Sequence, residues 1–377
     1  MSQVLLSRLS SSLAPRSHSL MQYKTSRLFS STSPYLALFC IETESSSCGG
    51  VSVFDVLLFD VAKEELVKVT DKTLPKELLN ANIVGASHGW DFHRDGHDGT
   101  LYMADIMNPL ASKTNPTIIH LPTVTPYSDS CQTELVSNVA MSSPPPPSQQ
   151  DDDDDDDWVV GIKFLGDQLS LCRPSRDLRW TNISTPFRTL QSSNLFFSKR
   201  DQTFNLPVPG GNNLCSWDLQ FHKDDSPKFH ELLFHNLPNL PQSMWELLAS
   251  SHREDYWVES PSGESFLVKW YSLVSHESTS SHTPMVFREE NSKEEGRRNM
   301  CYTEDIGDMC IFLSNSEAFC VPASSCPGLK PNSIYFRGHS LFAIYDLTTK
   351  NMRHFQHPKG LPKDIPFLPY WLPPFSI

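Results

Sequence analysis

The feature that most constrains the fold is a series of short apolar segments, each bounded by residues that favour turns. The clearest example is DYWVESPSGESFLVKWYSLV at residues 255–274, where two apolar runs flank the sequence SPSG. Two such runs separated by a glycine-containing turn predict a β-hairpin. The chain also contains 29 prolines and 11% aromatic residues, and proline ends helices whereas aromatic side chains favour strands. An all-β fold is therefore expected.

Similar segments recur from Tyr35, where YLALFCIE begins, to the end of the chain. Most of them pair with a neighbour across a short polar stretch, which predicts a succession of local hairpins. Helices are expected only from Pro241 to about Ser251, with proline in the first turn, and over a shorter stretch at 74–82. The turns of the expected hairpins lie at residues 62–65, 166–167, 199–201, 260–263, 314–315 and 337–339.

Successive strand pairs of this kind form a sandwich, a barrel or a propeller. The hairpins follow one another at intervals of roughly 40–50 residues, which is the size of a propeller blade. By that arithmetic the expected fold is a β-propeller of about six to seven blades, with one or two short helices. The hairpins resemble one another only weakly, so the pattern alone leaves the sandwich and the barrel open.

The N-terminal segment has the composition of an organellar transit peptide. It contains no Asp or Glu before Glu42, and serine is frequent in it, as is typical of such addresses. RLFSS at residues 27–31 resembles the mitochondrial processing pattern of Arg, any residue, an aromatic residue and Ser, which predicts cleavage after Phe29. The expected processing residues are Arg27, Phe29 and Ser30, and the expected location is the mitochondrial matrix. A chloroplast address, and a serine-rich N-terminus without an address, are the alternatives.

Charge and composition restrict the classes of partner. The formal net charge is −13 and no basic cluster occurs, which argues against direct nucleic-acid binding. No apolar run reaches about 18 residues, so no membrane insertion is expected. The nine cysteines are irregularly spaced and form no C-x-x-C pair. They predict reduced, buried thiols rather than a structural zinc site.

The stretch SSPPPPSQQDDDDDDD at residues 142–157 is of low complexity. Adjacent prolines favour an extended polyproline II segment, and adjacent aspartates repel one another. A calcium site needs ligands at varied angles on a turning loop that contains glycine, and this stretch has neither the turn nor the glycine. The expected structure is a solvated, disordered loop that interrupts the β domain.

Two short motifs resemble catalytic signatures but lack the required context. GASHG at residues 85–89 fits the G-x-S-x-G nucleophile elbow around Ser87, but the sequence after it has no helical period, and the elbow needs a helix there. His230 and His235 resemble the ends of a zinc-protease motif that holds one residue too many. In a strand, residues five apart face opposite sides, so these two histidines are not expected to share a metal. No catalytic residue is predicted from either motif.

Histidines and aspartates alternate in the segment that follows Ser87. A polar turn is the expected structure, and a metal site is the alternative. No dinucleotide-binding or phosphate-binding motif occurs in the chain, so no cofactor is expected. The alternating residues are His88, Asp91, His93, Asp95, His97 and Asp98.

Several longer strings carry a resemblance to a known family. They are DYWVESPSGESFLVKWY (255–271), the whole segment 302–336, and IYDLTTKNMRHF (344–355), extended by the segments 85–105 and 159–183. As a set they are similar to the plant KIB-type, F-box-associated β-propeller family, a plant family of unknown function. The resemblance is nearest to an organellar branch, known from crucifer plants, that has a transit peptide where its relatives carry an F-box.

The resemblance implies a KIB-type propeller domain over residues 35–377, after a transit peptide at 1–29. The residues before the first hairpin are transit-like and then β-like, so a helical F-box is not expected and ubiquitin-ligase subunits are unlikely partners. The family offers no established catalytic residues to carry over. The chain is therefore expected to be a soluble mitochondrial propeller that binds another, unidentified protein. An enzyme with a site in the propeller channel, and a ubiquitin-ligase adaptor with a degenerate F-box, are the alternatives.

Overall fold

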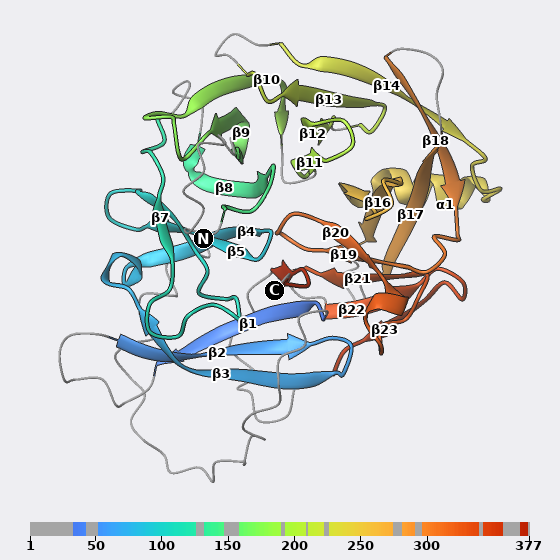
Figure 1. Ribbon diagram of the computed structural model, residues 1–377. Helices are drawn as coiled ribbons and strands as arrows, with labels where there is room; N and C mark the ends of the chain where they lie inside the picture. Colours follow the sequence, from blue (N-terminus) through green and yellow to red (C-terminus); the bar gives the residue numbers. More distant parts are fainter. Residues whose placement is uncertain are drawn as a thin grey trace.

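The structure, a computed structural model, is all-β. It describes 24 strands, one α-helix and two 3₁₀ helices within the described residues. Figure 1 shows the strands gathered into sheets around a central axis, which is the arrangement of a β-propeller. This confirms the expected fold class. The described residues are 33–42, 52–125, 132–146, 158–189, 193–208, 210–221, 226–273, 281–290, 296–338, 342–356 and 370–375.

Three of the five sheets are purely antiparallel and have the strand order of a propeller blade. Sheet A contains β24 (Trp371–Leu372), β1 (Tyr35–Glu42), β2 (Ser52–Asp60) and β3 (Glu65–Leu74). Sheet B contains β4 (Ala81–Ser87), β5 (Trp90–Asp95), β6 (Leu101–Ala104) and β7 (Ile118–His120). Sheet C contains β8 (Gln132–Met141), β9 (Val160–Cys172) and β10 (Thr181–Thr189).

The other two sheets each contain one parallel pair. In sheet D, β14 and β18 pair in parallel and join two antiparallel meanders of four strands. The first meander contains β11 (Phe196–Ser198), β12 (Thr203–Pro207), β13 (Asn213–Asp218) and β14 (Lys228–His235). The second contains β15 (His252–Glu259), β16 (Ser265–Leu273), β17 (Ser281–Glu290) and β18 (Arg297–Thr303). In sheet E, β19 and β21 are parallel, and the strands are β19 (Met309–Leu313), β20 (Phe319–Pro322), β21 (Ser333–Arg337), β22 (Phe342–Asp346) and β23 (Asn351–His354).

The two meanders of sheet D also meet at their other edges. The ring of Phe196 in β11 stacks on Trp257 in β15, with centroids 5.6 Å apart and an interplanar angle of 5°. Ser193 forms an isolated bridge with Asp255 of β15. Sheet D is thus nearly closed around its own core. Because the two meanders merge, the structure shows five sheets where the sequence predicted about six to seven separate blades.

Hydrophobic clusters join the sheets into a continuous ring. In the described residues, one cluster lies between each of the following neighbours: sheets A and B, sheets B and C, sheet C and the first meander of sheet D, the two meanders, the second meander and sheet E, and sheets E and A. Burial of these apolar faces supplies the main driving force for folding. Each sheet or meander is therefore covered on both faces, and none ends the stack.

The first and the last of the described strands meet in sheet A. Strand β24 pairs with β1, so that Trp371 lies opposite Leu36 and Leu372 lies opposite Tyr35. Trp371 is only 1% exposed, and its indole Nε1–H donates a hydrogen bond to the carbonyl oxygen of Leu313 in β19, 3.1 Å away. Residues near the two ends of the sequence thus close the ring and tie sheet A to sheet E.

One expected hairpin turn is wrong. Residues 166–167 lie inside β9, which runs on without a turn and pairs with β8 on one side and β10 on the other. Gly166 has a φ of +123°, and the pairing of β10 shifts between Ser184 and Thr189, the residue opposite Gly166. A glycine within a strand marks a bulge as well as a turn, and here it permits a bulge.

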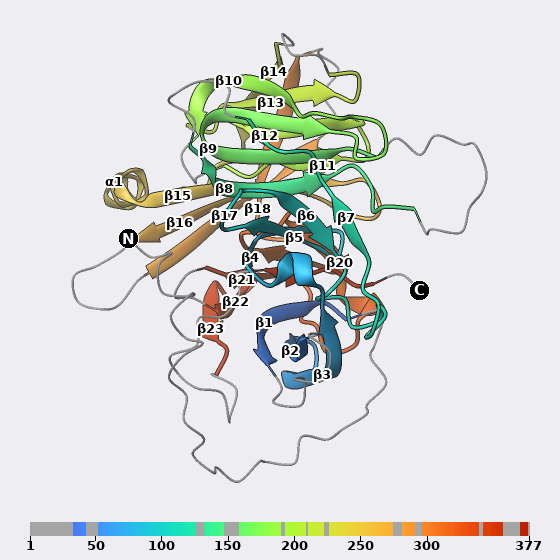
Figure 2. The ribbon, with the colours of Figure 1, turned by 90° about the vertical axis from the view of Figure 1, so that its left-hand side faces the viewer.

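The remaining local predictions agree with the structure, as far as the described residues extend. The expected helix is α1 (Gln242–Ser250), preceded by Pro241, and Figure 2 shows it at the periphery beside β15. The shorter candidate is the 3₁₀ helix η1 (Lys76–Leu78), and a second 3₁₀ helix, η2 (Ala323–Ser325), follows β20. The predicted processing residues Arg27, Phe29 and Ser30 and the Asp run at 151–157 lie outside the described residues.

Replacing Trp371 with Ala is expected to lower the free energy of unfolding by about 3–5 kcal/mol, because it removes a buried aromatic side chain from the closing strand. A matched control is Leu178→Ala at a side chain that is 93% exposed; it should change stability by no more than about 0.5 kcal/mol. Urea unfolding followed by far-ultraviolet circular dichroism measures both. Equal midpoints for the two variants would contradict the closing role of Trp371.

Candidate functional site

A cavity of about 1140 Å³ opens where the inner strands of the ring converge. The strands β4, β8, β11, β15 and β24 contribute residues at or just beyond their C-terminal ends, and β20 contributes its first residues. Figure 1 shows the dark red segment that contains β24 near the centre of the ring. The cavity therefore has walls from all five sheets, and it is the candidate functional site.

Glu317, in the loop between β19 and β20, links several strands at the cavity wall. Its carboxylate accepts a hydrogen bond from the Ser87 hydroxyl at 2.5 Å and from the Phe197 backbone N–H at 3.1 Å. Ser87 in turn accepts a hydrogen bond from the Met141 backbone N–H at 3.1 Å. One carboxylate thus connects the ends of β4 and β8 and the middle of β11 with sheet E.

Burial shifts the protonation of two groups in this wall. Desolvation raises the pKa of Glu317 to about 7, against the hydrogen bonds from Ser87 and two backbone amides, which lower it. Desolvation lowers the pKa of His88 to about 4, and the charge of Lys199 acts in the same direction. At neutral pH His88 is therefore uncharged, and Glu317 is partly protonated.

Two further charged groups of the cavity are occupied by partners within the protein. The Glu259 carboxylate accepts hydrogen bonds from the Ser198 hydroxyl and from the backbone N–H groups of Lys199 and Arg200. The Arg200 guanidinium donates to Asp201 at 3.0 Å and to Glu289 at 2.8 Å. These charges hold the hairpin between β11 and β12 against β15 and β17.

Lys199 differs from the other charged groups of the cavity. Its side chain is exposed at the cavity wall. Among the described residues, its ammonium is the one charged group of the cavity that has neither a hydrogen bond nor an ion pair. It stays close enough to His88 and Glu317 to influence the pKa of both.

The remainder of the wall is largely apolar and rich in aromatic residues and proline. Several of these side chains are partly or fully accessible rather than packed away. Accessible aromatic and proline side chains next to a few charged groups are characteristic of sites that bind other molecules. The accessible apolar residues of the wall are Trp90, Pro144, Pro145, Pro261, Ala318, Phe319, Pro373 and Pro374.

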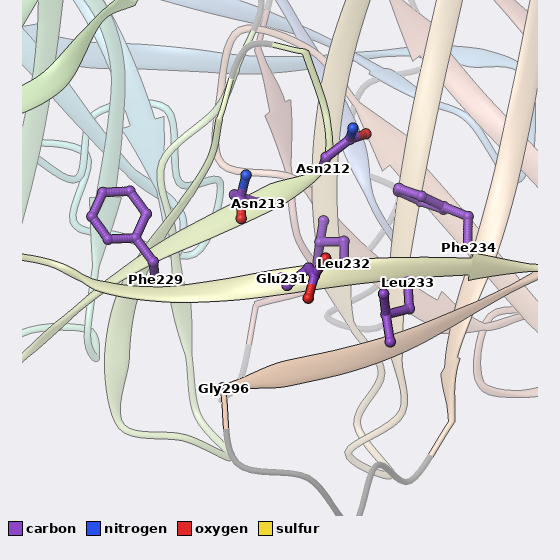
Figure 3. A pocket seen from close by; sticks show the side chains of 8 residues that line it. All are labelled: Asn212, Asn213, Phe229, Glu231, Leu232, Leu233, Phe234 and Gly296. Atoms are coloured by element: carbon purple, nitrogen blue, oxygen red, sulfur yellow. The ribbon is translucent and has the colours of Figure 1, made fainter.

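A second hollow, of about 640 Å³, lies where β14 and β18 pair at the outside of the ring. Figure 3 shows Leu232 and Phe234 on one side of β14 and Leu233 on the other. Side chains that alternate across a strand cannot form one wall. Its charged residue, Glu231, is already paired with Arg297 at 3.1 Å. This hollow is therefore a weaker candidate than the central cavity.

The histidines predicted after Ser87 do not come together. His88 lines the cavity, whereas His93 is buried with Nε2 2.5 Å from an Asp91 carboxylate oxygen, and His97 is exposed beyond the end of β5. Within the described ranges, no group of three or more His, Cys, Asp or Glu side chains is placed to hold a metal ion. The structure thus gives the alternative of a metal site in this segment no support.

The other predicted motifs have structural explanations. Ser87 is followed by a turn and then by β5, not by a helix, so the nucleophile-elbow context is missing, as predicted. His230 and His235 lie on strand β14, as expected for residues that face opposite sides. The six cysteines whose side chains are described are all free and buried. None of the helices in the described part of the chain is long and apolar enough to cross a membrane.

Glu317 and Lys199 were not predicted as site residues. The sequence placed both only near hairpin turns, where charged residues are ordinary. The one local signal is that Glu317 interrupts two apolar runs, and that signal does not identify its partners. Ser87 and Phe197 lie 230 and 120 residues away from Glu317 in the sequence.

Comparison with known proteins identifies the family. The model of the KIB1-4 β-propeller family matches residues 58–356. The chain belongs to the KIB1-4 β-propeller family. This confirms the resemblance that the segments 255–271 and 302–336 carry. No curated protein matches the chain.

Solved structures show only distant likeness. The N-terminal domain of Nup159 shares 9% identity at a TM-score of 0.32, over 86% of this chain and 83% of that one. A lignostilbene dioxygenase of Pseudomonas brassicacearum shares 8% identity at a TM-score of 0.33, and the match covers 86% of this chain and 77% of that one. AztD from Citrobacter koseri shares 9% identity at a TM-score of 0.26, and the match covers 90% of this chain and 98% of that one. Likeness at this level carries no information about activity.

The raised pKa of Glu317 predicts how stability depends on pH. Folding favours the neutral Glu317 carboxyl. Its contribution to the free energy of unfolding is therefore complete below its pKa of 4.5 in the unfolded chain, and it is lost as the pH rises through its folded pKa of about 7. His88 acts in the opposite sense between about 4 and 6.5. Burial lowers the pKa of Lys163 to about 7 and that of Lys269 to about 8, so both lysines add stability as the pH rises above 6.5. Because the wild type and Glu317→Gln share the lysines, the stability of the wild type relative to Glu317→Gln isolates Glu317, and this difference should fall from pH 6.5 to 8.

Urea unfolding at pH 6.5, 7.2 and 8.0 measures this difference. The control is Glu246→Gln at an exposed position of helix α1, away from the cavity, and it should retain the wild-type slope. A wild-type slope in Glu317→Gln would show that another group is responsible.

Proposed function

We propose that the protein is an interaction module that receives a segment of a partner protein in its central cavity. The carrying observation is the cavity itself, whose wall combines accessible aromatic and proline residues with one unpaired ammonium. Its volume of about 1140 Å³ exceeds the roughly 300–1,000 Å³ of sites for small ligands. The size therefore favours several residues of a polypeptide over a single small molecule.

The geometry supports binding in preference to hydrolysis at Ser87. The Ser87 side chain is only 3% exposed, and its hydroxyl proton is donated to Glu317. The same oxygen accepts a hydrogen bond from the Met141 backbone N–H. A nucleophile needs an accessible oxygen with a base beside it, whereas this oxygen is used to connect strands. An enzyme with a site in the channel therefore stays the second candidate.

We also propose that the ring has six blades. Counting each meander of sheet D as a blade gives six units together with sheets A, B, C and E. The support is that one hydrophobic cluster lies at each of the six contacts between these units. Six blades is the lower of the two blade numbers predicted from the sequence.

The location is part of the proposal and depends on the N-terminal sequence. Arg27, Phe29 and Ser30 fit the mitochondrial processing pattern, and the acid-free segment before them supports import. The partner is then a mitochondrial protein. A chain that kept its N-terminus and bound ubiquitin-ligase subunits would instead favour the adaptor alternative.

The processing prediction is tested on the C-terminally tagged full-length protein produced in plant cells. The purified protein should begin at Ser30, and Arg27→Ala should shift or abolish that cleavage because the pattern requires the arginine. Arg16→Ala, which lies outside the pattern, is the control and should leave the N-terminus at Ser30. Mass spectrometry of the N-terminal peptide identifies the first residue. A wild-type chain that begins at Met1 would contradict the address.

The binding prediction uses the same purification. A stoichiometric partner should elute with the wild type, and Ala318→Phe should reduce its recovery at least fivefold because the larger side chain fills part of the cavity. Ala111→Phe, away from the cavity, is the matched control and should retain the partner. Quantitative mass spectrometry measures the recovery, and thermal unfolding shows that each variant is folded. Equal recovery with both variants would place binding elsewhere on the molecule.

A further inference from the structure

The charge pattern of the cavity indicates the chemistry of its occupant. The Glu259 carboxylate accepts hydrogen bonds from a hydroxyl and two backbone N–H groups, and the Arg200 guanidinium is paired with two carboxylates. The Glu317 carboxylate accepts hydrogen bonds from a hydroxyl and a backbone N–H group. Within the described part of the wall, these groups already have partners, and Lys199 does not. An occupant therefore gains most by bringing an anion to Lys199.

The neighbours of Lys199 favour an anion over a cation. His88 is uncharged at neutral pH, since desolvation lowers its pKa to about 4. The carboxylates of the wall are engaged in bonds that a cationic ligand would have to compete with or share. A carboxylate, by contrast, meets the ammonium without displacing any bond of the fold. Long-range repulsion from the acidic chain is screened over a Debye length of about 8 Å at physiological ionic strength.

The apolar part of the wall adds a second requirement. Trp90, Phe319, Pro373 and Pro374 are all partly exposed and all line the cavity. Rigid aromatic and proline surfaces bind apolar side chains at a low cost in conformational entropy. The occupant should therefore present an apolar group together with its anion.

We propose that the occupant is a peptide segment of the partner in which an Asp or Glu carboxylate stands next to an aromatic or large aliphatic side chain. Lys199 pairs with the carboxylate, and the apolar side chain packs on the wall formed by Trp90, Phe319 and the two prolines. This assignment rests on the proposed function, and it specifies the partner's chemistry beyond it.

The test selects peptides from a random linear library displayed on phage against the immobilised full-length protein. Three baits are compared: the wild type, Lys199→Glu, and Lys228→Glu. Lys228 is exposed on β14 at the outside of the ring, so the control makes the same change of charge away from the cavity. Thermal unfolding midpoints show whether the baits are folded. If a charge-reversal variant does not fold, the corresponding variant with Gln, Lys199→Gln or Lys228→Gln, replaces it.

The wild type and Lys228→Glu should both enrich peptides that combine an acidic residue with an aromatic or large aliphatic one. Lys199→Glu should lose this enrichment. For the strongest synthetic peptide, fluorescence anisotropy should show a loss of affinity of about five- to tenfold or more with Lys199→Glu. The same peptide with its Asp and Glu changed to Asn and Gln should bind equally to the wild type and to Lys199→Gln. In this double-mutant cycle the peptide no longer has a carboxylate that could pair with Lys199.

The outcomes separate the two proposals. If no peptide is enriched on the wild type, the proposed function fails. If the enriched peptides are basic or neutral, or if acidic peptides are retained by Lys199→Glu, the inference about their chemistry is wrong while peptide binding stands. Replacing Asp151–Asp157 with Asn provides the last comparison. A marked gain in affinity for acidic peptides would show that the chain's own acidic run is the occupant, and would overturn the assignment to a partner.

Discussion

The ring depends on the pairing of its last strand with its first. Strand β24 has only two residues, yet it completes sheet A and covers the edge of β1. An uncovered edge would leave backbone groups without partners and apolar faces exposed. The entropic cost of closing so long a loop grows only with the logarithm of its length. A short strand that buries one large aromatic side chain, Trp371, is therefore sufficient to hold the two ends together.

Closure has a second consequence at the axis, because it brings the ends of several inner strands to one place. Their backbone N–H groups and hydroxyls then need acceptors, and an unpaired buried donor is costly. Glu317 and Glu259 supply those acceptors. Both carboxylates thus act as connections between strands. Lys199 has no such role in the described structure, and it is the charged group on which the proposed binding mode depends.

The accuracy of the sequence-based predictions depended on distance along the chain. The hairpin around residues 260–263 was predictable because its strands and its turn lie within about 20 consecutive residues. The turn predicted at 166–167 was wrong because a glycine permits both a turn and a bulge, and the pairing of β9 with β8 and β10 decides between them. The candidate site was not predictable, since Ser87, Lys199 and Glu317 each resemble ordinary turn residues in their local sequence.

The sequence by itself determined the all-β class, the positions of most hairpins, the one α-helix of the described residues and the membership of the family. These properties are encoded in local alternation, turn residues and strings of aromatic residues. Only the tertiary structure decided that the two meanders of sheet D merge, that Trp371 closes the ring, and that Glu317 meets Ser87. The physical reason is that these contacts join residues remote in sequence. They form only when the faces of all the sheets are buried against one another, and no local pattern specifies which turns then meet at the axis.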